Sequence, residues 1–126
     1  MTTIVANSQL TTAITVYDVA PEHQQQLVDI LLSAAEVLRK QKGFISINVH
    51  KSVDGTQVLS YSQWQSRQAF DAVLQNTKVI PFVQAVLKLA TFEPQVYEVV
   101  AVVQADDAAD KNEAPRRADS RKGGKK

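Results

Sequence analysis

The chain has 126 residues, of which 44% are hydrophobic, with four glycines and four prolines, and these values favour one compact domain with a core of useful size. The formal net charge of +1 is unevenly spread, because the segment from Gln104 onward holds seven of the fourteen basic and five of the thirteen acidic residues. The rest of the chain is near neutral and offers no large basic field that would attract nucleic acid or an anionic membrane.

The sequence also lacks several chemical motifs. There are no cysteines, which excludes disulfides, cysteine-based zinc sites, iron–sulfur clusters and thiol catalysis. Glycine-rich phosphate loops and the G-x-S-x-G motif are absent, so nucleotide cofactors and serine hydrolysis have no support. The first ten residues, MTTIVANSQL, lack the features of a signal peptide, and no segment approaches the length of a membrane span. We therefore expect a cytoplasmic protein.

The first predicted elements are a strand and a helix. Residues 10–17 alternate and are rich in β-branched residues, which predicts a strand with one face made of Leu10, Thr12, Ile14 and Val16. A helix is predicted from Pro21 to about Gln41, since proline suits the first helical position and Glu22 complements the helix dipole. Its apolar stripe consists of Leu27, Ile30, Leu31, Ala34 and Leu38. Gly43, preceded by basic residues, predicts the stop, because glycine accepts the left-handed capping conformation.

Two further strands joined by a tight turn are predicted next. Residues 44–51 alternate, with Ile45, Ile47 and Val49 on one side and Phe44, Ser46, Asn48 and His50 on the other. Asp54 and Gly55 form a strong hairpin signal, because glycine takes the positive φ that tight turns require. A third strand then runs from Thr56 to Trp64.

Helical patterns follow, and a fourth strand ends the series. Ser66 predicts the N-cap of a helix that breaks near Asn76 and carries Phe70, Val73 and Leu74. A second helix, with Pro81 in its first turn, has a stripe of Val79, Phe82, Val83, Val86, Leu87 and Ala90. Residues 95–103 predict the fourth strand.

The order strand, helix, strand, strand, helix pair, strand is typical of an α+β ferredoxin-like fold with the split βαβ pattern. In that fold a four-stranded antiparallel sheet carries its helices on one face, and the other face is commonly polar. Here both faces of the predicted third and fourth strands are apolar, with Leu59 and Tyr61 opposite Trp64 and valines on both sides of 95–103. Because large exposed apolar surfaces mark interfaces, we predict a homodimer whose sheets pack face to face.

The end of the chain differs from the rest in composition. The segment 104–126, QADDAADKNEAPRRADSRKGGKK, has mixed charge and no aromatic residue, so it cannot bury enough surface to offset the entropy of ordering it. We therefore predict a folded domain over residues 1–103 and a disordered tail over residues 104–126.

The third strand suggests a binding pocket. Alternation places four of its side chains on one face, namely Val58, Ser60, Ser62 and Trp64. If this face meets the helices, these side chains line a space together with Phe70, Phe82 and Val86, which is the usual composition of a small-molecule pocket. The alternative is that Trp64 is a core residue whose N–H meets a carbonyl. The pattern alone leaves both interpretations open.

The two histidines are weaker candidates for chemistry. His50 ends the second predicted strand and could accept or relay a proton, although a surface histidine at such a position is equally common. His23 lies among glutamines in the first helical turn and is expected to be solvated. No carboxylate stands near either histidine at metal-ligand spacing, so no metal site is predicted.

The run GFISINVHKSVDGTQVLSYSQWQSRQAFDAVL combines a glycine before the second strand, an Asp-Gly hairpin and a tryptophan that precedes a Ser-x-x-Ala-Phe helix. In these features the chain resembles the antibiotic biosynthesis monooxygenase family, over about Thr11 to Val103. Within that family it is most similar to the small monooxygenases of aromatic polyketide pathways, which turn anthrone-type phenols into quinones. The resemblance implies a dimeric ferredoxin-like fold, a pocket between helices and sheet, and oxidation of a small aromatic substrate by O2 without flavin, haem or metal.

The resemblance also implies roles for individual residues. Trp64 matches the family tryptophan and would donate its indole N–H to an oxygen of the substrate or of a peroxy intermediate. His50 matches a family histidine, although Val49 stands where the polyketide members have tyrosine. Ser60 stands where they have asparagine. Trp64, His50 and Ser60 are therefore the predicted catalytic residues.

The predicted substrate-binding residues are Ser62, Phe70, Phe82 and Gln84. Phe70 replaces a helix tyrosine of the family, and Gln84 replaces an arginine of the last helix. Haem-degrading relatives need a histidine near Leu74, which this chain lacks, so haem degradation is not expected. The prediction is a cofactor-independent monooxygenase acting on a phenolic, hydroquinone or anthrone-like compound. The alternative is a non-catalytic small-molecule-binding or stress-related dimer.

Overall fold

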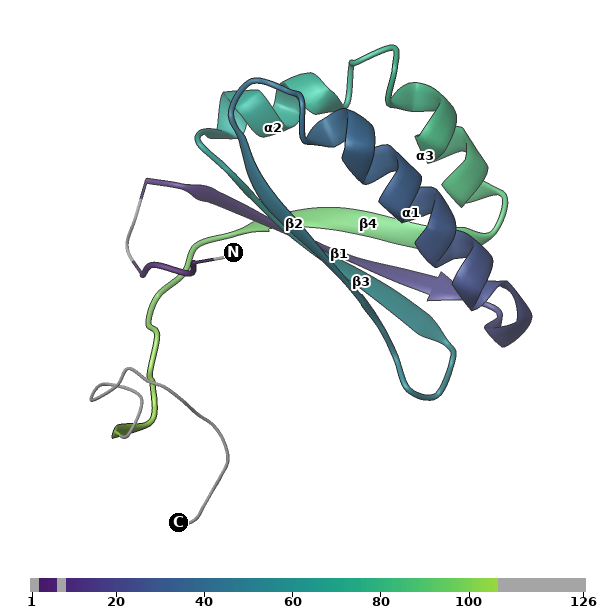
Figure 1. Ribbon diagram of the computed structural model, residues 1–126, viewed down its shortest axis with the longest axis horizontal. Coiled ribbons are helices and arrows are strands. Elements are labelled where there is room, and N and C mark those ends of the chain that lie inside the picture. Colours follow the sequence, from purple (N-terminus) through teal and green to yellow (C-terminus); the bar gives the residue numbers. More distant parts are fainter. Residues whose placement is uncertain (1–2, 7–8, 107–126) are drawn as a thin grey trace.

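The computed structural model describes residues 3–6 and 9–106, and within this range the helices lie on one face of a four-stranded antiparallel sheet (Figure 1). The strands are β1 (Thr11–Val19), β2 (Phe44–Lys51), β3 (Gln57–Trp64) and β4 (Ala90–Tyr97). The helices are the 3₁₀ turn η1 (Pro21–His23), α1 (Gln24–Leu38), α2 (Arg67–Val73) and α3 (Ile80–Leu87). The strand order is β2-β3-β1-β4. The predicted α+β ferredoxin-like fold is confirmed, whereas the homodimer concerns a second chain and stays a prediction.

The register of β1 against its two neighbours decides which side chains face the helices. Thr15 lies opposite Ser60 of β3 and opposite Pro94 of β4. Successive side chains of a strand point to opposite faces, so the odd-numbered residues of β1 and the even-numbered residues of β3 point toward the helices. Tyr17 and Trp64 are accordingly buried between the two layers.

Two glycines adopt a left-handed backbone where the sequence predicts turns. Gly55 has a φ of 86°, and Gly43 has a φ of 85°. Beside Gly55, Asp54 Oδ1 accepts hydrogen bonds from the Thr56 N–H (3.0 Å), the Thr56 hydroxyl (2.7 Å) and the Ser52 hydroxyl (2.8 Å). These bonds, the Thr56 N–H first among them, hold the pKa of Asp54 below its ordinary value. The predicted hairpin between β2 and β3 is therefore present.

The helix starts follow the sequence signals closely. The Ser66 hydroxyl accepts a hydrogen bond from the Ala69 N–H at 3.1 Å and caps α2. Pro81 lies in the first turn of α3, where its missing N–H leaves no helical bond unmade. Pro21 opens η1, and α1 then ends at Leu38, slightly before the predicted end.

β2 contains an irregularity that the alternation pattern does not anticipate. Phe44 lies opposite Trp64 but Ser46 lies opposite Gln63, so Ile45 is an extra residue in the strand. Phe44 therefore packs against Trp64 on the helix side, with ring centroids 5.2 Å apart. The prediction that Phe44 shares a face with Ser46 is wrong, because the bulge changes the phase of the alternation.

β4 begins and ends earlier than the sequence predicts. The strand runs over Ala90–Tyr97 instead of 95–103, and α3 ends at Leu87 instead of reaching Ala90. Pro94 explains the error, because a proline suggests that a strand starts only after it. β4 is an edge strand, however, and an edge strand tolerates proline where the missing N–H would face solvent.

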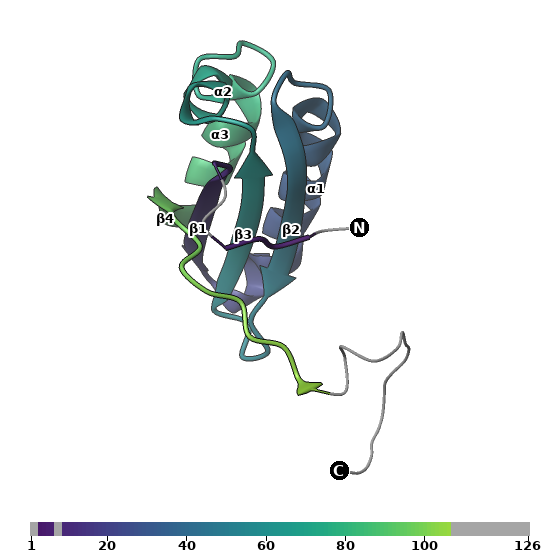
Figure 2. The ribbon, with the colours of Figure 1, turned by 90° about the vertical axis from the view of Figure 1, so that its left-hand side faces the viewer.

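The chain beyond β4 leaves the sheet (Figures 1 and 2). Residues 98–106 belong to no strand, and Val100 in this segment is 76% exposed. The predicted apolar strand over 95–103 therefore gives no support to the homodimer. Of the predicted tail, residues 107–126 lie outside the described residues, so the disorder and the domain boundary stay predictions.

Two apolar clusters pack between the sheet and the helices. One is formed by the buried residues Tyr17, Val19, Leu27, Leu31, Val58, Val86 and Ala90. The other is formed by Trp64, Val73 and Val79, with Phe44 and Phe70 against them. Members of both clusters line one cavity, which is described next.

Candidate active site

A cavity of about 130 Å³ lies between the sheet and the helices. Every strand and each of α1, α2 and α3 contributes to its lining. The helices supply only apolar side chains, among them Leu31, Ala34, Val73, Val83 and Val86. The result is an apolar roof above a sheet surface that carries the polar groups.

The polar groups are four hydroxyls that lie side by side on the central strands. Thr15 and Tyr17 come from β1, and Ser60 and Ser62 come from β3. All four side chains are buried. Because Thr15 pairs directly with Ser60 in the antiparallel register, the hydroxyls form one continuous row, which we call the hydroxyl row.

The indole of Trp64 closes one end of the hydroxyl row. Trp64 is 1% exposed, and its Nε1–H donates a hydrogen bond to the Ser62 hydroxyl at 3.0 Å. The Ser62 hydroxyl in turn donates to the Ala13 carbonyl at 3.5 Å. The indole is thus satisfied by a side chain that itself lines the cavity, and not by a backbone carbonyl as the core interpretation requires.

Tyr17 lies at the other end of the hydroxyl row. Its hydroxyl and that of Ser60 are 3.4 Å apart and hydrogen bonded, and its ring centroid is 5.0 Å from that of Phe92. Burial raises the pKa of the Tyr17 phenol above its ordinary value, while hydrogen bonds with Ser60 and Thr15 offset part of the rise. The phenol therefore stays protonated at every physiological pH.

Aromatic side chains from the helix layer complete the wall around the indole. Phe70 of α2 packs edge-on against Trp64, with ring centroids 5.9 Å apart, and Phe82 of α3 also lines the cavity. Leu74 and Pro94 line it too and are exposed, so the cavity approaches the surface at these residues.

The structure brings five of the seven predicted site residues to one cavity. They are Ser60, Ser62, Trp64, Phe70 and Phe82. His50 is exposed on β2 and pairs with Leu59, on the sheet face that points away from the helices. Gln84 is exposed on α3, two positions after Phe82, which turns it to the opposite side of the helix. The roles assigned to all seven residues stay predictions.

Sequence reasoning missed Thr15 and Tyr17. The alternation along residues 10–17 does place Ala13, Thr15 and Tyr17 on one face. The other face, with Ile14 and Val16, is more apolar, and the pattern therefore favours it as the buried face. In the structure the helix-facing side of β1 carries Thr15 and Tyr17, and both line the cavity. A few hydroxyls within a mostly apolar wall are typical of a small-molecule site.

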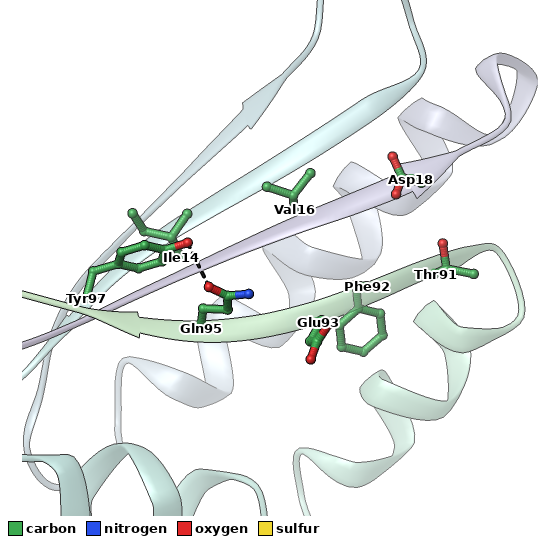
Figure 3. Close-up of a pocket in the computed structure, with 8 residues that line it drawn as sticks. All are labelled: Ile14, Val16, Asp18, Thr91, Phe92, Glu93, Gln95 and Tyr97. Carbon is green, nitrogen blue, oxygen red and sulfur yellow. Dashed lines mark hydrogen bonds between the residues drawn. The ribbon is translucent and has the colours of Figure 1, made fainter.

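A second concavity lies on the outer face of the sheet, between β1 and β4 (Figure 3). This open groove of about 390 Å³ is bordered by the carboxylates of Asp18 and Glu93. The Tyr97 hydroxyl donates to Gln95 Oε1 at 3.0 Å, and the Tyr97 ring lies beside Ile14 (Figure 3). The groove lies on the face that points away from the helices, and Trp64 does not line it.

The part of the chain that the structure describes contains no group of three or more histidine, aspartate or glutamate side chains that could hold a metal ion. Within the same residues no helix is both long enough and apolar enough to cross a membrane. The cytoplasmic location stays a prediction.

Comparison with known families decides what kind of protein this is. The model of the family described as antibiotic biosynthesis monooxygenase matches residues 11–85, which run from the start of β1 into α3 and include the hydroxyl row and Trp64. The chain belongs to the antibiotic biosynthesis monooxygenase family. It is therefore an enzyme of the monooxygenase type, and the predicted family is confirmed.

Individual oxygenases are similar to this chain as well. Tetracenomycin-F1 monooxygenase of Streptomyces glaucescens is 39% identical over 82 residues, which are 64% of this chain and 73% of that protein. Among solved structures, SnoaB, a cofactor-independent oxygenase from Streptomyces nogalater, matches with a TM-score of 0.69 and 18% identity, covering 78% of this chain and 100% of that one. The ActVA-Orf6 monooxygenase of Streptomyces coelicolor matches with a TM-score of 0.69 and 24% identity, covering 76% of this chain and 92% of that one. The two structural matches confirm the fold.

Proposed function

We propose that the protein oxidises a phenolic, hydroquinone or anthrone-like compound with O2 to a quinone, without flavin, haem or metal. The observation that carries this proposal is the buried cavity whose floor is the hydroxyl row and Trp64 and whose roof is apolar. The likeness to tetracenomycin-F1 monooxygenase and to SnoaB, a cofactor-independent oxygenase, supports the same reaction class.

The proposed reaction draws its electrons from the substrate. A deprotonated phenol or anthrone passes one electron to O2, and the resulting substrate radical and superoxide combine into a new carbon–oxygen bond. Protonation gives a hydroperoxide at a carbon that still carries hydrogen. Loss of that hydrogen as a proton, with cleavage of the O–O bond, leaves the quinone carbonyl and one water. One oxygen atom enters the product, and O2 accepts four electrons in all.

The protein would contribute a dry and oriented site to this reaction. The apolar roof holds the ring and excludes water, which strengthens each polar contact made to it. The hydroxyl row supplies donors to the charge that develops on oxygen. The Trp64 N–H, which donates to the Ser62 hydroxyl, would exchange that partner for an oxygen of the substrate or of the hydroperoxide.

The size of the cavity favours a small substrate or a roof that moves. An engineered apolar cavity of about 150 Å³ holds benzene, which is close to the volume found here. A single-ring phenol or hydroquinone therefore fits the structure as it stands. A three-ring anthrone requires outward movement of α2 and α3 beside the exposed Leu74.

We also propose that the protein acts as a homodimer, with sheets packed face to face. On the outer face Ile14 lies opposite Tyr61 and Val16 lies opposite Leu59, and these four residues form what we call the outer apolar patch. Val16 is exposed although it is β-branched and apolar. A self-complementary patch at the centre of an uncovered sheet supports an isologous contact.

Oxygen uptake by metal-free protein tests the proposed activity. The panel would run from hydroquinones through naphthalene hydroquinones to anthrones, with Trp64→Phe beside the wild type and Tyr97→Phe as a variant altered on the outer face. We expect uptake above the spontaneous rate for wild type and Tyr97→Phe, and a loss of about tenfold or more for Trp64→Phe. Labelled O2 should place one oxygen atom in the quinone formed from a phenol or an anthrone, where the oxidised carbon carries hydrogen at the start. Uptake no faster than buffer across the panel would contradict the proposal.

The same assay tests the residues outside the cavity. Oxygen uptake by His50→Ala and Gln84→Ala tests whether His50 has the catalytic role, and Gln84 the substrate-binding role, that the family resemblance implies. A large loss in either variant would mean that the site extends beyond the residues lining the inner cavity.

A binding role without catalysis is the second candidate. It is favoured by the absence of histidine, aspartate, glutamate, lysine and arginine among the described residues that line the cavity, which leaves no side chain suited to act as a base near neutral pH. Saturable binding of a phenol by wild type, together with no oxygen uptake on the panel, would favour this role.

A further inference from the structure

Among the described residues that line the inner cavity, Tyr17 is the only one with a titratable side chain. No acidic or basic residue shares that wall, so a phenol bound there has no protein base to take its proton. The oxidation of a phenol still requires its anion. A cavity of this kind can meet that requirement by favouring the ionised substrate over the neutral one.

The hydroxyl row has the geometry needed to favour an anion. A hydroxyl group donates one hydrogen bond and accepts two, and its hydrogen rotates freely. The Tyr17–Ser60 contact can therefore run from Ser60 to Tyr17, and the phenolic hydrogen of Tyr17 is then available to the cavity. Thr15 lies two positions before Tyr17 on the same face of β1 and lines the same cavity.

We propose that Tyr17, held by Ser60 and Thr15, donates its phenolic hydrogen to the substrate oxygen, and that the cavity thereby takes up a phenol as its phenolate. This inference rests on the proposed function, because it names the group that holds the substrate of that same site. Under this inference the protein needs no catalytic base. Solvent takes the proton of the phenol, and the protein binds the resulting phenolate in preference to the neutral phenol.

The surroundings of Tyr17 suit a neutral donor. Its raised pKa keeps the phenol protonated beside a bound anion, so it can donate where an ionised tyrosine could not. The charged residues of its own strand and of β4, Asp18 and Glu93, lie on the outer face of the sheet. The helices contribute apolar side chains alone to this cavity. No carboxylate of these elements faces the phenol to repel the anion.

Binding of 4-nitrophenol tests the proposal directly. This single-ring phenol suits the size of the cavity, ionises near neutral pH, and reports its yellow anion by absorbance. Titrations at several pH values give the affinity for each form and the pKa of the bound probe. Tyr17→Phe removes the hydroxyl and keeps the ring against Phe92, and Tyr97→Phe removes a tyrosine hydroxyl from the outer face as the matched control. Ser60→Ala, which removes the partner of Tyr17, serves as a second variant.

We expect wild type and Tyr97→Phe to bind the anion more tightly than the neutral phenol, which lowers the pKa of the bound probe. In Tyr17→Phe the affinity for the anion should fall about tenfold, with the affinity for the neutral form changed by less than about twofold. Ser60→Ala should show a smaller change of the same sign. An equal loss for both forms in Tyr17→Phe, or none, would overturn the inference.

The oxygen uptake assay separates failure of this inference from failure of the proposed function. If wild type consumes oxygen and yet shows no preference for the anion, the inference is wrong and the proposed function stands. If wild type neither consumes oxygen nor binds the probe, both are wrong. A preference for the anion that depends on Tyr17, without oxygen uptake, supports the inference and favours a binding role.

Discussion

The Nε1–H of Trp64 and the hydroxyl of Ser62, two residues apart on the same face of β3, form a 3.0 Å hydrogen bond at the edge of the cavity. This hydrogen bond connects the indole of Trp64 to the hydroxyl row. It also means that the indole reaches a ligand only by giving up a partner that is already in place. Ser62 is thus a positioning residue for the indole as well as part of the cavity wall.

Ser62→Ala removes the acceptor and leaves the indole N–H unpaired in a buried position. We expect the free energy of unfolding to fall by about 1–3 kcal/mol, which is the usual cost of such a group. Urea unfolding followed by the fluorescence of Trp64 measures this. Ser33→Ala, on the exposed side of α1, is the matched control and should unfold at the wild-type midpoint. Equal midpoints for both variants would show that the hydrogen bond contributes nothing to stability.

Gly43→Ala should destabilise the fold through two separate causes. The residue has a φ of 85°, which costs an alanine about 1–2 kcal/mol. In addition, a Cβ at this position would lie 2.5 Å from the Cβ of Ala69. We expect the cost of Gly43→Ala to drop to the backbone part alone when it is made in an Ala69→Gly background. A double-mutant cycle by urea unfolding measures this difference, and strict additivity would contradict the collision.

Asp54 gives the stability of the hairpin a pH dependence. Its pKa is lowered in the folded state, so its contribution to stability is present above the ordinary value near 3.8 and is lost as the pH falls through the folded value. Asp54→Asn should therefore lower the urea midpoint at neutral pH, and the gap between variant and wild type should close on acidification. Asp71→Asn, which alters an exposed ion pair with Arg67, is the comparison. A gap that widens in acid would reverse the assigned sign.

Tyr61→Lys tests the outer apolar patch. A lysine at position 61 would lose its hydration in the proposed interface or would keep the two sheets apart. We therefore expect the dissociation constant of the proposed dimer to rise by about tenfold or more. Leu32→Lys adds the same charge on the exposed side of α1 and should leave the association unchanged. Sedimentation equilibrium measures both. An unchanged profile for Tyr61→Lys would remove the sheet face as the site of contact.

Local chemistry made most of the fold predictable from the sequence. The Asp54-Gly55 turn, the Ser66 cap and Pro81 each act within a few residues, so their effect can be inferred without knowing the partner strand. Alternation alone placed Trp64 on one face with Ser60 and Ser62, and the structure adds that this face meets the helices and lines the cavity. At these positions the contacts made by the rest of the fold leave the local conformation unchanged.

The errors arise where the outcome depends on a neighbouring strand. Pro94 reads as a strand break until β4 is known to be an edge strand. The bulge at Ile45 leaves no mark in the residue pattern, because it is defined by the register against β3. The contact between Tyr17 and Ser60 is of the same kind, since the two residues lie 43 positions apart and only the pairing of β1 with β3 brings their hydroxyls together.

Pro94 has a consequence for how copies of this protein can meet. A free strand edge is a template for adding another strand, and such addition leads to open-ended aggregation. The free edge of β4 lacks one amide donor at Pro94, and the opposite edge of the sheet, β2, is interrupted by its bulge. Both ends of the sheet therefore resist edge-to-edge polymerisation. The broad surface of the sheet is then the place left for the proposed dimer contact, and a pairwise contact there closes on itself and stops.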